Sequence, residues 1–428
     1  MAVSRGRHCV GSSAVLTVLA ALSMGKISQG AVATWIGGAS PNKWATGSNW
    51  STGAQPGGSS TALFNTAPAN LTVSMSNTNG ISAGPITFDT GAGNFNFSTT
   101  GPLNLTAGLK TVTQGTGVNR VESFNIPVVL LGGYTFENDV ANTGSTLVYG
   151  STVTTTASNT STLTLAGSGT GTNSIAGVIS DTTTGTLGKI AITSTATAGA
   201  WKLSAPNTYT GNTTITSGNI ILAGGAGTNV LAGTAVTVGN AAAAGAAAKL
   251  SVTGTVTIGT TSAGTLTLVG GDSATSTGGT LDMADGALGS LTLRNATNGA
   301  TVRTLGGAAG KKAAMNFDVT SGGVDQLLMA GLINIGDGGG IISLNAVGIP
   351  ALNTPYTLIS TGGLAAGSFD FTHLTFADGG YSAVIGGNTY TLSSNATSEF
   401  LTVSVPEPAA CATALIATSG LLRRRRSA

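Results

Sequence analysis

Residues 201–222 read WKLSAPNTYTGNTTITSGNIIL, and this mixture of short apolar runs with Gly, Asn, Ser and Thr recurs through the middle of the chain. Comparable runs, most of them alternating an apolar residue with Thr, occur at 163–165, 236–238, 256–258, 266–268 and 291–293. An apolar side chain at every second residue gives a strand one buried face, and Thr suits the solvated face. The Gly, Asn and Ser residues between the runs are typical of turns. The pattern therefore predicts an all-β chain of short strands.

Composition indicates how these strands are arranged. The chain has 428 residues, which is more than one compact core normally holds, yet only 7% of them are charged and 5% aromatic, and 66 are Gly. Few side chains could fill a thick core, so a thin core inside a repeat array is favoured. The runs that start at 220, 236, 256, 266 and 291 are 10 to 25 residues apart, near or below one solenoid coil. We expect a right-handed parallel β-helix, or solenoid, with N-terminal and C-terminal caps; a β-sandwich array is the alternative.

One unit of the array can be compared with a known repeat. Residues 171–225 resemble the autotransporter-associated β-strand repeat, chiefly through WKLS at 201–204, NTYTGNTTI at 207–215 and GNIIL at 218–222. The resemblance covers about an eighth of the chain. It implies the β-helical architecture of autotransporter passengers and supplies no activity.

The first 33 residues follow the plan of a secretion signal. Arg5 and Arg7 provide a positive start, residues 10–24 are apolar, and Ala31-Val32-Ala33 has the small residues of a cleavage site. We expect export and cleavage after Ala33. The alternative, an uncleaved membrane anchor, would need a longer apolar run, of about 20 residues.

Residues 405–428 combine three features in a fixed order: Pro406, Glu407 and Pro408, then an apolar segment at 409–422, then Arg423, Arg424, Arg425 and Arg426. Together they resemble the PEP-CTERM sorting signal. The resemblance implies a transient transmembrane helix, an exosortase-type membrane protease as partner, and transfer to the cell surface or an exopolysaccharide matrix. The cationic cluster would stay on the cytoplasmic side of the membrane. A plain C-terminal anchor that is never processed is the alternative.

Removing both ends changes the charge of the chain. The formal net charge is +2, but the remaining body has 10 basic and 14 acidic residues and no cysteine, since Cys9 and Cys411 lie in the ends. An acidic body argues against a nucleic-acid partner. The absence of body cysteine excludes disulfides, thiol nucleophiles and cysteine-type zinc sites there.

Trp35, Trp44 and Trp50 fall within sixteen residues, in a segment that we assign to an N-terminal cap at 34–66. Bulky aromatics could close the open end of the first coil, or their faces could contact carbohydrate rings. The solenoid is expected at 67–314. A second β region or cap, richer in Phe and Tyr, is expected at 315–404.

Catalytic chemistry is not indicated. The body has one histidine, His373, in the strand-like FTHLTF at 371–376, where we expect it to face solvent. The closest carboxylate pairs, at 282 and 285 and at 318 and 325, lack a calcium-loop pattern and are expected to be solvated turn residues. We predict no catalytic residue, metal or cofactor.

The predicted function is therefore that of a non-enzymatic, exported surface or matrix protein acting through structure, adhesion or polysaccharide contact. The alternative is a β-helix polysaccharide lyase or hydrolase.

Overall fold

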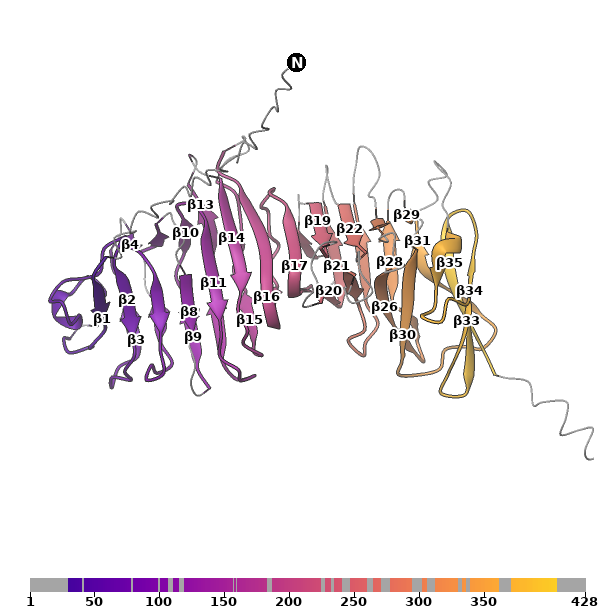
Figure 1. Cartoon of the computed structure of the whole chain (residues 1–428), viewed down its shortest axis with the longest axis horizontal. Helices are drawn as coiled ribbons and strands as arrows, with labels where there is room; N and C mark the ends of the chain where they lie inside the picture. Colours follow the sequence, from indigo (N-terminus) through magenta and orange to yellow (C-terminus); the bar gives the residue numbers. More distant parts are fainter. Residues whose placement is uncertain are drawn as a thin grey trace, which may run out of the picture.

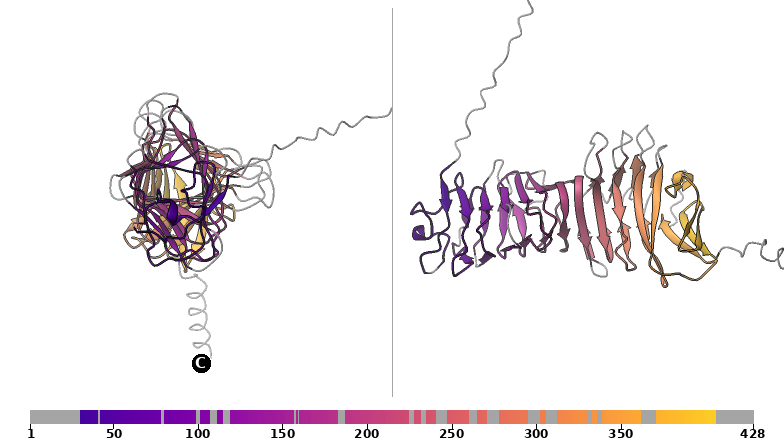
Figure 2. Two further views of the ribbon diagram at one scale, coloured as in Figure 1. Left: turned by 90° about the vertical axis from the view of Figure 1, so that its left-hand side faces the viewer. Right: turned by 60° about the horizontal axis from the view of Figure 1, so that its bottom comes forward.

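Short parallel strands stack in register along one axis and form an elongated β-solenoid (Figure 1). Viewed end on, the chain winds around a single interior (Figure 2). The structure is a computed structural model. It describes residues 30–405 apart from 41, 78–79, 99–100, 107–110, 115–118, 157, 159, 183–186, 225–227, 232–234, 241–246, 260–264, 271–277, 295–301, 306–311, 330–332, 336–338 and 362–370. The all-β parallel solenoid predicted from the sequence is confirmed, rather than a sandwich array.

The pairings divide the solenoid into three faces. The first face comprises β1 (Val32–Thr34), β2 (Thr61–Phe64), β5 (Ile86–Phe88), β8 (Thr111–Gln114), β11 (Tyr134–Asn138), β14 (Ser161–Ala166), the first parts of β16 (Ile190–Leu203) and β17 (Thr213–Ala223), β19 (Ala235–Val238), β22 (Thr265–Val269), β25 (Val302–Leu305) and β29 (Ile333–Ile335). The second face comprises β3 (Thr72–Ser74), β6 (Asn96–Ser98), β9 (Val121–Phe124), β12 (Thr146–Tyr149), β15 (Thr172–Ile175), the second parts of β16 and β17, β20 (Ala248–Thr253), β23 (Thr280–Asp282), β26 (Ala313–Thr320), β30 (Gly340–Ala346) and β32 (Leu374–Thr375).

The third face forms two separate sheets. One contains β4 (Ile81–Ala83), β7 (Leu103–Leu105), β10 (Val128–Leu130) and β13 (Val153–Thr155), and the other contains β18 (Thr228–Leu231), β21 (Thr255–Ile258), β24 (Ser290–Leu293), β28 (Gln326–Met329) and β31 (Pro355–Ser360). Isolated bridges at Ile179 and Asn207 fill the interval between the two sheets. Antiparallel strands β35 (Ser398–Ser404), β34 (Asn388–Ser394) and β33 (Ser382–Ile385) then extend the second sheet beyond β31.

Successive coils explain the spacing of the sequence runs. Ala62 of β2 pairs with Ile86 of β5, and Ile86 pairs with Val112 of β8, so these two coils take 24 and 26 residues. The runs at 236 and 266 lie on the first face, the run at 220 on the second, and the runs at 256 and 291 on the third. The intervals between runs are irregular in the sequence because consecutive runs lie on different faces of the solenoid. Parallel pairing also continues past residue 314, as far as β31 and β32.

Strands β16 and β17 turn the corner between the first two faces without a break, which is why those faces count as one 23-stranded sheet. Gly218 lies at the corner of β17 with φ +77°, a conformation that side chains rarely adopt. A Cβ atom there would lie 2.7 Å from the carbonyl oxygen of Ala196 in β16. Glycine at this position therefore permits both the turn and the close approach of the neighbouring coil.

Side chains of one type stack on top of one another inside the solenoid. Phe97, Phe124 and Tyr149 are register partners on β6, β9 and β12. Their ring centroids are 4.7 and 4.8 Å apart, with interplanar angles of 5° and 9°. Phe136 of β11 stacks on Tyr149 from the first face at 4.0 Å. The rings form a continuous aromatic ladder, which buries large apolar surfaces at the spacing of adjacent strands.

Candidate functional site

The three predicted carbohydrate-contact residues lie inside the N-terminal cap. Trp35, Trp44 and Trp50 are each at most 1% exposed. Their rings pack edge to face, with centroids 5.0 Å apart for Trp35 and Trp50 and 4.8 Å apart for Trp44 and Trp50, and all three contact Phe64. The proposed sugar-stacking platform is wrong, because a ring can stack on a sugar only where one of its faces is open.

The predicted processing sites lie at the margins of the described residues. Ala33 is buried in β1, where Val32 and Ala33 pair with Thr61 and Ala62, whereas Ala31 is exposed. Cleavage after Ala33 would remove Val32 and Ala33 from β1. The cleavage position stays a prediction. The sorting residues, Pro406, Glu407, Pro408, Arg423, Arg424, Arg425 and Arg426, and the predicted transmembrane segment at 409–422 lie outside the described residues. Within the described part, no helix is long and apolar enough to cross a membrane.

The carboxylates that the sequence places in turns have structural partners. Asp282 forms an ion pair with Lys249 at 2.8 Å. Asp318 and Asp325 are fully buried, which corrects their prediction as solvated residues. Their oxygens accept hydrogen bonds from backbone N–H groups: Asp318 from Gly286 at 2.6 Å, and Asp325 from Asp318 at 2.7 Å and Gly289 at 2.6 Å. These bonds hold the loop before β24 against the hairpin formed by β26 and β27 (Gly323–Val324).

Burial raises the pKa of Asp325 to about 7, although the two backbone hydrogen bonds act in the opposite direction. His373 ends the 3-10 helix η2 (Phe371–His373) and is half-buried, so the predicted exposed strand position is wrong. Over the described ranges, no three His, Cys, Asp or Glu residues are grouped so that they could hold a metal ion.

A groove on the third face is a candidate binding site. Thr255, Ser290 and Gln326 are the first residues of β21, β24 and β28, and they are register partners in that order. Each is half-buried, while the next residue of each strand points into the core. Adjacent strands are about 4.8 Å apart. The three polar side chains therefore form an outward-facing row along the axis of the rod.

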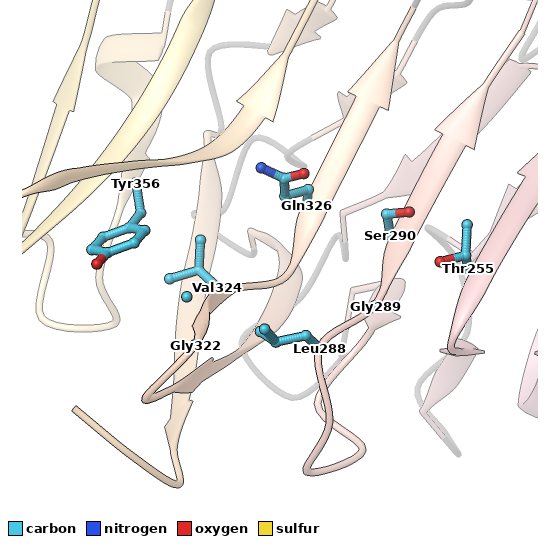
Figure 3. Close-up of a pocket in the computed structure, with 9 residues that line it drawn as sticks. Thr255, Leu288, Gly289, Ser290, Gly322, Val324, Gln326 and Tyr356 are labelled. Carbon is cyan, nitrogen blue, oxygen red and sulfur yellow. The ribbon is translucent and has the colours of Figure 1, made fainter. Parts of the chain in front are cut away.

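Tyr356 of β31 and Leu288 complete this groove, which we call the Tyr356 groove (Figure 3). The pocket measures about 400 Å³ and is lined by Thr255, Leu288, Gly289, Ser290, Gly322, Gly323, Val324, Gln326 and Tyr356. Figure 3 shows Gln326, Ser290 and Thr255 following one another away from the Tyr356 ring. The Tyr356 hydroxyl accepts a hydrogen bond from the Ala351 N–H at 2.9 Å, which fixes the ring.

Hydroxyl groups, one amide and one aromatic ring can bind a ligand through hydrogen bonds and stacking. The residues that line the groove include no acid or base of the kind used in glycoside hydrolysis. Sequence reasoning missed this site because its polar residues are 35 and 36 positions apart. The only available signal was a polar residue before each of the short apolar runs.

Comparison with known proteins adds no assignment to this geometry. No protein-family model matches the chain, and no curated protein sequence matches it.

Proposed function

We propose that this chain is an exported, non-enzymatic protein of the cell surface or extracellular matrix, which acts by displaying a β-rod. Its C-terminal tail would be recognised by an exosortase-type membrane protease. The observation that carries the proposal is where the described strands end. Within the described residues the last strand, β35, ends at Ser404, and Val405 is 57% exposed. Every described strand therefore precedes Pro406, so cleavage at the Pro-Glu-Pro motif would remove none of them.

The apolar interior and the long side faces of the rod also support a role in display at the cell surface. Its interior is a continuous row of apolar and aromatic side chains, and within the described residues one ion pair joins Lys249 to Asp282. A solenoid of stacked coils presents long side faces, which suit contact with extended polymers. Adhesion or polysaccharide contact on such a face needs no catalytic group.

Replacing Arg423, Arg424, Arg425 and Arg426 together with Ala is expected to leave an unprocessed precursor in the membrane fraction. The physical reason is that a cationic cluster holds the end of an apolar segment on the cytoplasmic side. The measurement is the mass and cell fraction of the protein in its native host. Replacement by Lys keeps the charge and serves as the control for membrane orientation. Unchanged release and mass in the Ala variant would contradict the proposed sorting.

The non-enzymatic part of the proposal has a separate test. Incubating the purified rod with pectin and alginate in the presence of calcium is expected to release no products, measured by reducing ends and by absorbance of unsaturated uronates. Heat-unfolded rod is the control for spontaneous breakdown. Reproducible depolymerisation above that control would favour the lyase or hydrolase instead.

A further inference from the structure

We propose that the Tyr356 groove binds a neutral, extended polysaccharide chain that lies along the axis of the rod. This inference rests on the proposed function, because it names the class of polymer that a displayed rod would contact. It concerns a site different from the buried tryptophans of the N-terminal cap.

The polar row sets the direction of the ligand. Thr255, Ser290 and Gln326 repeat at the spacing of parallel strands, about 4.8 Å. One sugar unit of an extended polysaccharide has a similar length and presents hydroxyl groups at each step. Hydroxyl and amide side chains can donate to such groups and accept from them. A sugar chain along the axis would therefore meet one polar side chain for about each unit.

Tyr356 supplies the stacking element at one end of the row. Its ring is half-buried and lies beside Gly323, where a Cβ atom would be 3.9 Å from the ring carbons. The hydrogen bond from Ala351 already fixes the ring, so little side-chain freedom is lost when a ligand stacks on it. Gly322, which is exposed, adds bare backbone to the groove lining, and Leu288 adds an apolar side chain that is 44% exposed.

Charge selects a neutral polymer over a uronic-acid polymer. None of the nine lining residues is charged. Carboxylates adjoin the lining residues: Gly289 in the groove wall donates its N–H to Asp325, and Asp325 directly follows Val324 in the chain. Asp285 lies in the same loop as Leu288. A polyanion would find no basic side chain in the lining to offset its charge, and the exposed carboxylate of Asp285 would add repulsion.

An extended peptide is a poorer match for the same surface. Peptides that bind sheets do so mainly through backbone hydrogen bonds to an open edge strand. Strands β21, β24 and β28 each have a hydrogen-bonded neighbour on both sides. The groove therefore offers side chains and not an open backbone edge.

The test uses the purified mature protein and measures binding by isothermal titration calorimetry. The probes are cellohexaose, mannohexaose, laminarihexaose and a polymannuronate hexamer, with gelatin as the extended polypeptide. We expect binding to at least one neutral hexaose and none to polymannuronate. Y356A and Q326A are each expected to weaken that binding at least tenfold. Y381A removes an exposed tyrosine outside the groove and is expected to bind like the wild type.

Several results would overturn the inference. These are failure of all neutral hexaoses to bind, stronger binding of polymannuronate or gelatin, or equal affinity in Y356A. Thermal unfolding of each variant shows whether its fold is retained, and Q326A tests the groove if Y356A is unstable. A rod that is exported and processed normally but binds no glycan would overturn this inference alone. Retention inside the cell would contradict the proposed function, whatever the groove binds.

Discussion

Replacing Phe124 with Ala is expected to lower the free energy of unfolding by about 3–5 kcal/mol, the range for truncating a buried phenylalanine. Phe124 is fully buried and stacks between Phe97 and Tyr149 in the aromatic ladder. Its removal leaves a cavity, and the two neighbouring rings are held by their own strands. Because each coil contacts only its neighbours, the loss should be concentrated around β6, β9 and β12. Urea unfolding followed by circular dichroism measures the total effect.

Two variants of the same ladder serve as matched controls. F124L keeps most of the volume and is expected to cost about 1 kcal/mol. Y149F removes a buried hydroxyl that has no hydrogen-bond partner among the described residues, so it should be neutral or stabilising by about 1 kcal/mol. A Phe124→Ala variant as stable as F124L would contradict the role that we assign to the stacked rings.

Raising the pH from about 4 to about 8 is expected to destabilise the folded rod. Burial raises the pKa of Glu122 and of Glu399 to about 8. Both carboxyl groups therefore hold a proton in the folded chain over a pH range in which the unfolded chain has lost it, since an ordinary Glu has a pKa of about 4.3. Each protonated glutamate contributes its full stabilisation below the pKa that it has in the unfolded chain. That contribution is lost as the pH rises through the higher pKa that it has in the folded chain.

The surroundings of Glu122 and Glu399 explain why the pKa of each is raised. Glu122 accepts a hydrogen bond from the Phe95 N–H at 2.8 Å, but its other oxygen has no hydrogen-bond partner in the described part of the chain. Arg120 nearby lowers the pKa of Glu122 less than burial raises it. For Glu399, one carboxyl oxygen is buried without a hydrogen-bond partner in the same part of the chain. A charge at either position is therefore poorly compensated.

The measurement is the free energy of unfolding in urea at pH 5 and at pH 8.5. We expect the value at pH 8.5 to be lower by on the order of 3–4 kcal/mol for each of the two groups that titrates in full. E399Q cannot ionise and is expected to show a smaller difference between the two pH values, and E122Q should act in the same way. Greater stability at pH 8.5 than at pH 5 would contradict the prediction. D282N is the control variant, because it removes the acid of the ion pair with Lys249 and leaves Glu122 and Glu399 in place.

Much of the fold follows from local pattern. Alternation of apolar residues with Thr predicted strands at 163–165, 236–238 and 291–293, and the structure contains all three with their apolar side chains buried. This succeeded because side chains alternate between the two faces of any strand, whatever its neighbours are. The low content of aromatic and charged residues was likewise enough to favour a thin solenoid core over a thick globular one.

The candidate sites depended on contacts between distant residues. The sequence could not distinguish a buried tryptophan cluster from an exposed platform, because Trp35, Trp44 and Trp50 are enclosed by one another and by Phe64. Nor could it show that the pair at 318 and 325 is buried, since their hydrogen-bond donors include the backbone of a loop at 286–289. In both cases burial is set by the packing of neighbouring coils.

The sequence by itself determined the all-β class, the thin core and the inward-facing residues, because each depends on side chains a few positions apart. Only the tertiary structure decided the three faces, the aromatic ladder and the Tyr356 groove. Those features depend on register between coils, which brings Thr255, Ser290 and Gln326 into one row although 35 and 36 positions separate them along the chain. Because the coils differ in length, no fixed repeat period in the sequence predicts which residues become register partners.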